Sequence, residues 1–367
     1  MRVLHCIPSM DGGGAERQLT YLVAELQRLG VDTHVALVSR GPNWSRLIAT
    51  GAAVHQLPAR SPHDPFLLRR LFKTIRSVDP DVVQVWLRQM DILAGFAALL
   101  LRKPLVVTER ASRAAYPLSV KHLVRLRVGS FASAVVANSE EGERYWRGRI
   151  NRRGRSCIIS NAVPVAEIAS TPAVQDIVAG ERRLVLFAGR MEPQKNLEVL
   201  LPALLMTLDG NDFDMVFCGE GSLKSRIVEW IDRNGLGRRA RVLGYTPMLW
   251  GLMKRASVLV SPAWFEGTPN VVLEAMACRC PLVVSDIPEH REFLDESSAL
   301  FARPSSSAEI ASAIRTVLTD PGAARIRANA AFARLERFDP PGIARQYLEL
   351  YRTILREPRV AVRPVSA

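Results

Sequence analysis

Cysteines and long hydrophobic runs are scarce in this sequence. The 367 residues include five cysteines, an odd number, and Cys6, Cys157 and Cys218 lie in apolar runs typical of buried strands. Both facts argue against a disulfide framework and favour a reducing compartment. The longest purely apolar run, Ile92–Leu101, is much shorter than the about 20 residues of a membrane-spanning helix, and the N-terminus does not resemble a signal peptide. We therefore expect a cytoplasmic protein that is soluble or held peripherally at the inner face of the cytoplasmic membrane.

Metal-ligand clusters and aromatic residues are also sparse. Cys278 and Cys280 are separated by one residue, and no second pair or nearby His completes a zinc site, so both are interpreted as core thiols. No Asp-x-Asp element follows a strand to hold a divalent cation. Aromatic residues make up 7% of the chain, are not interleaved with basic residues, and accompany no recognised nucleic-acid motif. The sequence therefore predicts neither a metal site nor a nucleic-acid partner.

Acidic residues are outnumbered by basic ones, and the imbalance is local. The chain has 49 Lys and Arg against 36 Asp and Glu, a formal net charge of +13. Residues 1–175 hold 24 of the basic and 13 of the acidic residues, so the remainder is almost neutral. Such a surplus favours an anionic partner, such as a membrane surface or a phosphorylated substrate. We expect this partner to contact the first half of the chain.

Segment 118–131 is the strongest candidate for that contact. Its basic residues Lys121, Arg125 and Arg127 are mixed with apolar ones, as in an amphipathic helix that lies on an anionic bilayer. The alternative interpretation is a helix face that is merely solvated.

Short apolar runs alternate with helix-period segments along the whole chain, which predicts an α/β protein with parallel sheets. The first series of strand-like runs comprises Val3–Ile7, Thr33–Val38, Val54–Leu57, Val82–Val85, Leu105–Thr108, Ala134–Ala137 and Ser156–Ile159. The second comprises Leu184–Ala188, Met215–Cys218, Ala240–Leu243, Val258–Val260 and Leu282–Val284. Helical stretches between runs include Ala15–Leu29, Phe66–Ser77 and Ile92–Leu101. Residues 163–179, rich in Pro, Ala and Thr, separate the series as a linker, so we expect two doubly wound domains.

A glycine-rich loop, Asp11–Arg17, follows the first strand and opens a helix. Gly13 and Gly14 allow close backbone approach, and a helix N-terminus attracts anions. The glycines are consecutive, and Ser39-Arg40, with no acidic residue, ends the second strand, which argues against a dinucleotide-binding fingerprint. A turn that only connects the two elements is the alternative.

Two cations, Arg190 and Lys195, follow the first strand of the second series. Ligands of open parallel sheets bind beyond the carboxyl ends of the strands, and an Arg beside a Lys suits a diphosphate. Asn196 is a favourable helix N-cap. Solvated surface cations are the alternative.

Two carboxylates, Glu266 and Glu274, are separated by seven residues across a loop and a helix start. Pro269-Asn270 opens this helix, so we expect free N–H groups near Val271 and Val272 for phosphate oxygens. Glu274, one turn into the helix, can accept hydrogen bonds from sugar or ribose hydroxyls. A purely structural role for both carboxylates is the less favoured alternative.

Together these motifs resemble the retaining, nucleotide-sugar-dependent glycosyltransferases often called family four. The resemblance covers nearly the whole chain and rests on GGGAERQL, ISNAVP, GRMEPQKN, Gly219-Glu220-Gly221 and the Glu-x7-Glu element. It implies the GT-B fold, in which two facing Rossmann-like domains enclose an interdomain cleft. It also implies a last helix that crosses back to the first domain, and catalysis without a metal or other cofactor.

Carried over residue by residue, the resemblance assigns a donor site. Arg190 and Lys195 would hold the donor diphosphate, Glu274 the ribose hydroxyls, and Glu266 the transferred sugar. Backbone groups beside Glu266 would join it, namely those of Gly267, Thr268, Pro269, Asn270 and Val271. Gly13 and Gly14 would approach the donor from the opposite wall. The base would lie near Tyr245 and Thr246.

The first domain of this family binds the acceptor, often a lipid-linked one. We therefore expect the following cations on the acceptor or membrane side: Arg110, Arg113, Lys121, Arg125 and Arg127.

Two positions depart from the family pattern. Where many relatives carry a His after the fifth strand, this sequence has Glu109-Arg110. Glu109 is a candidate for a catalytic contact with the sugar or the acceptor hydroxyl, and Arg110 for an acceptor phosphate; an internal Glu109–Arg110 pair is the alternative. Arg279 stands where a Gly is usual, which costs about 1 kcal/mol if its backbone is left-handed.

The sequence therefore predicts an enzyme, a retaining, metal-independent hexosyltransferase of cell-surface polysaccharide synthesis. Its donor would be a nucleotide sugar, UDP-hexose or UDP-HexNAc, and its acceptor a glycan or a polyprenyl-diphosphate-linked glycan. Residues 1–170 would form the acceptor domain, 171–340 the donor domain, and 341–367 the returning helix and a tail. A nucleotide-sugar 2-epimerase of the same shape and a non-catalytic sugar-nucleotide or membrane-binding subunit are the alternatives.

Overall fold

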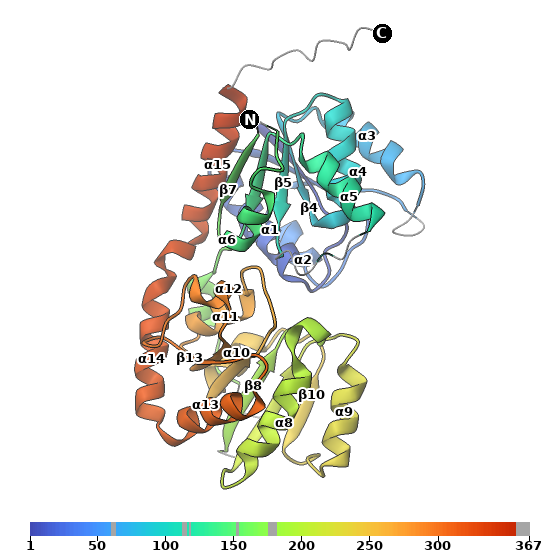
Figure 1. Cartoon of the computed structure of the whole chain (residues 1–367). Helices are drawn as coiled ribbons and strands as arrows, with labels where there is room; N and C mark the ends of the chain where they lie inside the picture. The colour runs from blue at the N-terminus through green and yellow to red at the C-terminus, as the bar shows by residue number, and fades with distance from the viewer. Residues whose placement is uncertain (60–63, 112–115, 117–118, 152–153, 175–181, 357–367) are drawn as a thin grey trace. The chain divides into compact units, whose positions relative to one another are not determined.

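The computed structural model describes residues 1–59, 64–111, 116, 119–151, 154–174 and 182–356. It divides into two compact units (Figure 1). The first unit comprises residues 1–138, 142–162 and the chain from Pro340, and the second comprises residues 139–141 and 163–339. The last helix therefore groups with the first unit, although the sequence places it after the second series of strands.

The first unit is built on a seven-stranded parallel sheet of order β3-β2-β1-β4-β5-β6-β7. Its strands are β1 (Arg2–Cys6), β2 (Asp32–Leu37), β3 (Ala53–Gln56), β4 (Val82–Trp86), β5 (Leu105–Glu109), β6 (Ala134–Ala137) and β7 (Arg155–Ile158). All seven predicted strands are confirmed within one or two residues. Strands β1, β4, β5 and β6 are almost fully buried, which is why they read as continuous apolar runs rather than alternating ones.

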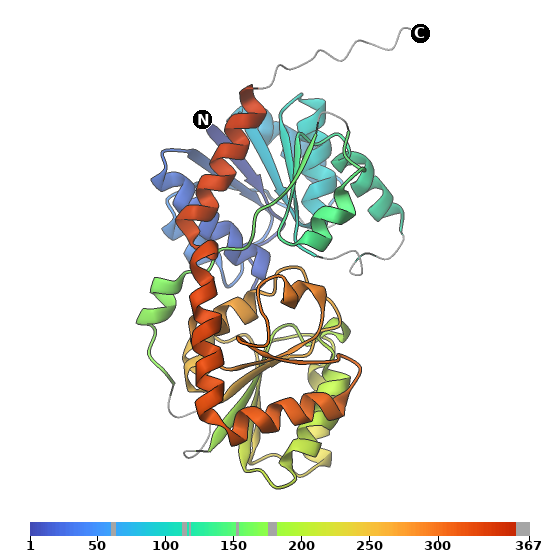
Figure 2. The same cartoon turned by 60° about the vertical axis from the view of Figure 1, so that its left-hand side comes forward.

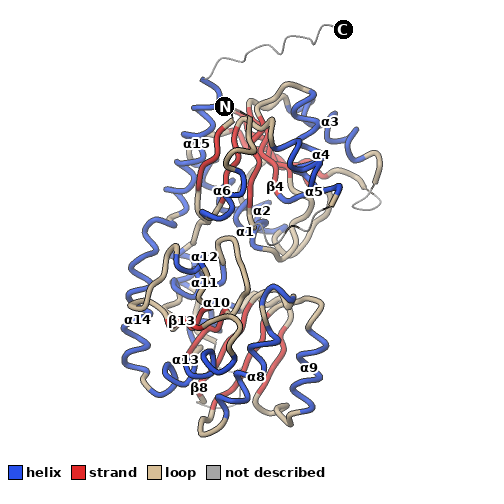
Figure 3. Tube along the Cα trace, viewed as in Figure 1, coloured by secondary structure: helices blue, strands red, loops and turns tan. Residues whose placement is uncertain are grey.

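Helices cover both faces of this sheet, and Figure 3 shows them in blue on either side of the red strands. They are α1 (Gly14–Arg28), α2 (Trp44–Ala49), α3 (Leu67–Val78), α4 (Leu87–Leu100), α5 (Val120–Gly129), α6 (Glu140–Trp146) and α15 (Pro340–Arg356). Helices α1 and α15 pack together over one core, whereas α3, α4 and the end of α5 cover the core on the opposite face. Tyr347 and Tyr351 of α15 are buried in the first of these cores, which fixes the returning helix to this unit. Figure 2 shows this helix, in red, running along the first unit.

The second unit has a six-stranded parallel sheet of order β10-β9-β8-β11-β12-β13. Its strands are β8 (Arg183–Ala188), β9 (Phe213–Cys218), β10 (Ala240–Leu243), β11 (Val258–Ser261), β12 (Leu282–Ser285) and β13 (Leu300–Ala302). The edge strand β13 was not predicted, because three residues are too few to show a period.

Helices pack on both sides of this second sheet. The α-helices are α7 (Val165–Ser170), α8 (Leu197–Leu208), α9 (Lys224–Arg233), α10 (Leu249–Arg255), α11 (Asn270–Ala277), α12 (Pro288–Arg291), α13 (Ser307–Thr319) and α14 (Pro321–Ala333). Short 3-10 helices η2 (Pro193–Lys195) and η3 (Arg334–Phe338) complete the unit. Helix α7 lies within the predicted linker, whose last residues, 175–179, fall outside the described part of the chain.

Candidate functional site

Several of the predicted donor residues lie near the point where the second sheet reverses its strand order. From β8 the chain adds β9 and β10 on one side, then continues through β11, β12 and β13 on the other. Neighbouring strands β8 and β11 pair in parallel, so the loops that follow both leave from the same sheet edge. Such a switch point is where open α/β sheets bind ligands.

Lys195 and Glu266 join these two loops. The Lys195 ammonium, at the end of η2, forms an ion pair with the Glu266 carboxylate from the loop after β11, and both side chains are largely buried. Gln194 adds a hydrogen bond from its amide to the Phe265 carbonyl oxygen, 2.8 Å long. Arg190 is exposed and donates to Gln194 at 3.2 Å. The structure thus brings Arg190, Lys195 and Glu266 together.

Asn196 has a different role from the predicted helix cap. It occupies the residue before α8, but its side chain accepts no capping hydrogen bond. Its backbone is left-handed, with φ 57°, and its buried amide donates instead to the carbonyl oxygens of Pro262 (2.9 Å) and Pro304 (2.6 Å). A single amide therefore ties the loop after β8 to two other loops, which keeps Lys195 in register with Glu266.

Gly219 and Gly221, in the loop after β9, pack closely against the backbone of the loop after β8. Their φ angles are 135° and 154°, and a Cβ atom would lie 2.0 Å from the Gly189 carbonyl oxygen at Gly219 and 2.4 Å from that of Met191 at Gly221. The Met191 N–H donates to the Glu220 carbonyl oxygen at 2.8 Å. Glycine is required here because two backbone segments approach too closely for any side chain.

Replacing Gly219 with alanine should lower the unfolding free energy by about 1–3 kcal/mol more than the same change at Gly210. Both glycines have positive φ, but a Cβ at Gly210 would meet nothing within 4 Å. The comparison therefore separates the collision with Gly189 from left-handed strain alone. Urea denaturation measures both variants, and equal losses would contradict the supporting role of Gly219.

Helix α11 presents the second carboxylate. The helix begins at Asn270 after Pro269, as predicted. Glu274 is 4% exposed and accepts a hydrogen bond from the indole N–H of Trp250 at 2.9 Å. The prediction of a free N–H at Val272 is wrong, since that group donates to the Pro269 carbonyl oxygen at 3.0 Å. This N–H group is already engaged in a turn at the start of the helix.

The loop after β10 holds the two residues predicted to lie near the base. Tyr245 is half exposed, and the Thr246 hydroxyl accepts a hydrogen bond from the Met248 N–H at 3.2 Å. Strand β10 lies at the sheet edge beyond β9, so Tyr245 and Thr246 leave from the same carboxyl edge as Arg190.

Two residues after β12, Glu289 and His290, lie near Glu266 and were not identified from the sequence. The buried Glu289 carboxylate accepts from the Glu266 N–H at 3.3 Å. His290 is fully buried, with Nδ1 2.8 Å from the Ser285 carbonyl oxygen and Nε2 without a partner among the described residues. Burial lowers the pKa of His290 and raises that of Glu289. Their position after a strand of the same sheet edge was the signal that could have indicated them.

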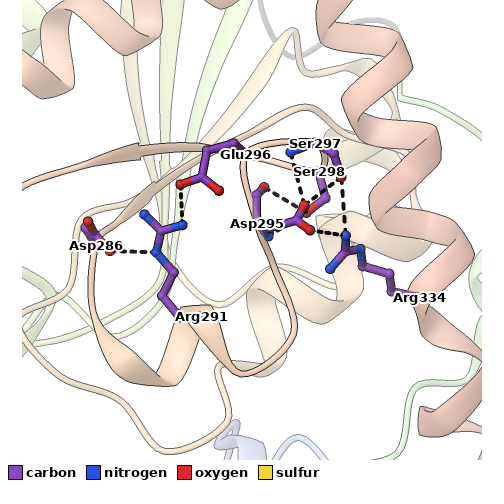
Figure 4. Close-up of polar contacts among 7 residues, drawn as sticks. All are labelled: Asp286, Arg291, Asp295, Glu296, Ser297, Ser298 and Arg334. Atoms are coloured by element: carbon purple, nitrogen blue, oxygen red, sulfur yellow. Dashed lines mark hydrogen bonds and ion pairs between the residues drawn. The ribbon is translucent and has the colours of Figure 1, made fainter.

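Ion pairs hold the segment that carries Glu289 and His290 (Figure 4). Arg291 of α12 donates to Asp286 at 2.7 Å and to Glu296 at 2.5 Å. Asp295 accepts hydrogen bonds from Ser297 and Ser298 and pairs with Arg334 of η3. These contacts hold the pKa of Asp295 well below its usual value. The segment that carries Glu289, which contacts Glu266, is therefore held by ion pairs on both sides of α12.

The residues assigned to the opposite wall lie in the first unit. Gly13 precedes α1, and a Cβ there would meet the Glu16 carboxylate at 2.3 Å. Gly14 is the first residue of α1, and Glu109 ends β5 at the same carboxyl edge of the sheet as the loop after β1.

Glu109 is not placed to touch a sugar. It is completely buried, and one carboxylate oxygen accepts from the Arg110 and Ala111 N–H groups and the Tyr116 hydroxyl. The other accepts from the Trp146 indole and pairs with Arg125, each at 2.9 Å. With five donors and no exposure, the carboxylate stabilises the fold. We therefore correct its catalytic assignment.

Arg110 is likewise engaged within the first unit. Its guanidinium donates to Asn161 at 2.7 Å and to Tyr347 of α15 at 2.8 Å, and it stacks on Trp86 at 4.4 Å. Its side chain does not pair with Glu109, so the alternative is wrong, whereas the contact with an acceptor phosphate stays a prediction. Arg110 fixes the returning helix.

Arg125 is the clearest correction to the predicted membrane-facing cations. Its side chain is 1% exposed and pairs with Asp91 at 2.7 Å as well as with Glu109. Lys121 and Arg127 of the same helix are exposed, whereas Arg113 lies outside the described residues. A cation with two buried carboxylate partners cannot face a membrane.

Arg279 is left-handed, with φ 54°, at the end of α11. Its guanidinium stacks on Phe332 at 3.7 Å and donates to Asn329 at 2.8 Å. These contacts stabilise a left-handed backbone at the position where the resemblance implied a Gly. The neighbours Cys278 and Cys280 are buried free thiols, as predicted.

Comparison with known proteins agrees with this architecture. The family model described as Glycosyltransferase Family 4 matches residues 12–167, and that described as Glycosyl transferases group 1 matches residues 174–334. The structure of HepE from Anabaena in complex with UDP and glucose superposes with a TM-score of 0.83 at 21% identity, over 96% of this chain and 100% of that one.

Two curated relatives come from Campylobacter jejuni. The N-acetylgalactosamine-N,N'-diacetylbacillosaminyl-diphospho-undecaprenol 4-alpha-N-acetylgalactosaminyltransferase is 24% identical over 94% of this chain and 97% of its own length. The GalNAc-alpha-(1->4)-GalNAc-alpha-(1->3)-diNAcBac-PP-undecaprenol alpha-1,4-N-acetyl-D-galactosaminyltransferase is 23% identical over 95% and 98%.

Two Rossmann-like units on parallel sheets define a two-domain protein of the GT-B fold, which confirms the predicted fold class. The chain belongs to the group 1 glycosyltransferases.

Proposed function

We propose that this glycosyltransferase moves a sugar with retention from a UDP-sugar to a hydroxyl of a glycan on a polyprenyl diphosphate. The observation that carries the proposal is the Lys195–Glu266 pair at the switch point of the second sheet, beside Arg190 and the start of α11. The names of the Campylobacter jejuni relatives support a polyprenyl-linked acceptor, and the HepE complexes support UDP.

Arg190 and Lys195 would stabilise the charge of the leaving diphosphate. Breaking the bond between the anomeric carbon and the phosphate oxygen places negative charge on that oxygen, and fixed cations lower the barrier most where charge develops. The Lys195 ammonium has three N–H donors, so it can keep its pair with Glu266 and still donate to a phosphate oxygen. In this proposal Arg190 and Lys195 stabilise the negative charge of the diphosphate, which is the role that a metal ion would otherwise have.

Retention follows in this proposal from attack on the face that the diphosphate leaves. The acceptor oxygen would bond to the anomeric carbon while its proton passes to the departing phosphate oxygen. Glu266 and the backbone from Gly267 to Asn270 would orient the sugar, and Glu274 the ribose hydroxyls. The Trp250 indole holds one Glu274 oxygen, which leaves the carboxylate oriented before the donor binds.

The change Glu274→Gln should weaken binding of the UDP-sugar about 10- to 100-fold, because a hydrogen bond to a charged group contributes about 1.5–3 kcal/mol. Glutamine keeps the shape and an oxygen for Trp250, so the fold should persist. Isothermal titration calorimetry measures the affinity. The matched control is Glu229→Gln on α9, whose exposed carboxylate pairs only with Arg233 in the described contacts, and which should bind UDP-sugar as the unchanged protein does.

An unchanged affinity in Glu274→Gln would contradict the donor-site assignment.

Two further experiments test the nucleotide and the reaction. A thermal-shift screen of UDP-, GDP- and ADP-sugars should show the largest rise in melting temperature with UDP-sugars. Incubation with the UDP-sugar alone should give no epimer, whereas addition of a polyprenyl-linked acceptor should give a transfer product.

A further inference from the structure

The outer surface of α4 and α5 in the first unit exposes large apolar side chains. These helices pack side by side, next to α3, on one face of the sheet (Figure 1). Val120 is 77% exposed and Leu123 58%. The apolar part of this surface, called here the α4–α5 face, comprises Phe96, Leu100, Val120, Leu123, Val124 and, just after α5, Phe131.

The spacing of these residues places them on the outward sides of their helices. Phe96 and Leu100 are four residues apart on α4, and Val120, Leu123 and Val124 are three and four apart on α5, which is the spacing of one helix face. The opposite sides carry buried residues such as Ala94 and Val128 that contribute to the core. The apolar side chains of the α4–α5 face therefore point away from the core and are exposed.

The charges on this surface have one sign. Lys121 and Arg127 are exposed among the apolar residues of α5. The neighbouring helix α3 adds Arg69, Lys73 and Arg76, all exposed. Within α3, α4 and α5 the one acidic residue is Asp91, which is buried against Arg125. The α4–α5 face thus combines apolar side chains with cations that no carboxylate on these helices neutralises at the surface.

We propose that the α4–α5 face binds the surface of an anionic lipid bilayer. The apolar side chains would enter the boundary between headgroups and acyl chains, and the long stems of Lys121 and Arg127 would place their charges at lipid phosphates. Exposed apolar clusters rimmed by cations are uncommon on proteins that contact only water. No helix in the described part of the chain is long and apolar enough to cross a membrane.

This inference deepens the proposed function, on which it rests, because a polyprenyl-linked acceptor is held in such a bilayer. It corrects the sequence-based expectation in two respects. Arg125 does not belong to the surface, and the exposed apolar residues of α4 do.

Flotation of the full chain with lipid vesicles tests the proposal. The protein should float with vesicles of phosphatidylcholine and phosphatidylglycerol, much less with phosphatidylcholine alone, and less again at high salt because the surface charges are screened. Changing Val120→Glu together with Leu123→Glu should lower the partition coefficient at least about tenfold, since each change replaces apolar contact with a charge that the bilayer repels.

A matched control replaces two exposed apolar residues outside this face with glutamate. Ile48 on α2 is 50% exposed and Ile326 on α14 is 70% exposed. The combined change Ile48→Glu and Ile326→Glu adds the same charge and should leave flotation unchanged. Circular dichroism and thermal unfolding verify that both double variants fold, and Leu100→Glu alone provides a second variant on α4.

Two outcomes overturn the proposal. Either the unchanged protein fails to float with phosphatidylglycerol vesicles, or the folded Val120→Glu, Leu123→Glu variant floats as well as the control. Calorimetry with UDP-sugar, performed on the same samples, reports the proposed function separately. Flotation without UDP-sugar binding would contradict the proposed function alone, and binding without flotation would contradict the membrane contact alone.

Discussion

The change Lys195→Ala should lower the rate of sugar transfer about 100- to 1,000-fold, the usual effect of removing one donor that stabilises developing charge. Lys195 lies in the loop after β8 and pairs with Glu266 across the switch point. Its removal deletes a cation from the expected position of the diphosphate and leaves the Glu266 carboxylate without its counter-ion. Steady-state kinetics with UDP-sugar and acceptor measure the loss.

Arg233→Ala is the matched control. Arg233, on α9 of the same unit, pairs with Glu229 at 3.1 Å in an exposed contact, so its removal should leave the rate unchanged. If Lys195→Ala unfolds, Arg190→Ala tests the same point, because Arg190 is exposed and its loss should not disturb the fold. A transfer rate that survives both changes, with the fold intact, would contradict the assignment of the diphosphate site.

The change Arg125→Met should lower the unfolding free energy by about 3–5 kcal/mol, the range observed when one partner of a buried ion pair is removed. Arg125 is the shared partner of Asp91 and Glu109, and all three are buried. Methionine would fill the space between Tyr116 and Trp146, on which the guanidinium stacks. It would nevertheless leave two buried carboxylates facing each other without a cation. Chemical denaturation measures the loss.

Lys121→Met is the control for this prediction. Lys121 lies on the same helix, and the sequence suggested the same role for it, but it is exposed, so its loss should change stability little. Equal stability of the two methionine variants would contradict the buried cluster.

A second comparison uses Asp91→Asn, which keeps the shape and leaves Arg125 and Glu109 as a neutral pair. It should therefore destabilise the protein far less than Arg125→Met. Burial raises the pKa of Asp91 to about 6. A carboxyl whose pKa is raised in the folded state favours folding when protonated, so its contribution declines as pH rises through the window from about 4 to about 6. Asp91→Asn should flatten that part of the stability profile.

Much of the fold was predictable because of how parallel sheets are buried. A strand covered by helices on both faces needs apolar residues at consecutive positions, and β4, β5 and β6 show this pattern over their full length. Strand β13, with three residues at a sheet edge, is too short and too exposed to show it. The loops after β8 and β11 were predictable for a related reason, since ligand-binding residues follow strand ends.

The predictions that failed concern partners distant in the sequence. Arg125 reads as one more cation of an amphipathic helix, because Asp91, its partner, lies 34 positions away. Glu109 reads as a catalytic candidate until Trp146 and Tyr116 are seen to saturate it. Helical periodicity reports which side of a helix is apolar, but it does not report which charged residue is buried against another element.

By itself, then, the sequence determined the two series of parallel strands, the positions of Arg190, Lys195, Glu266 and Glu274 at strand and helix ends, and the surplus of positive charge in the first half. These are local properties, written in the period of apolar residues and in the residues that follow each strand. Only the tertiary structure decided which charges are free. It buried Arg125 between two carboxylates and left Lys121 and Arg127 on the surface, because an ion pair depends on distances in space that the order of residues does not contain.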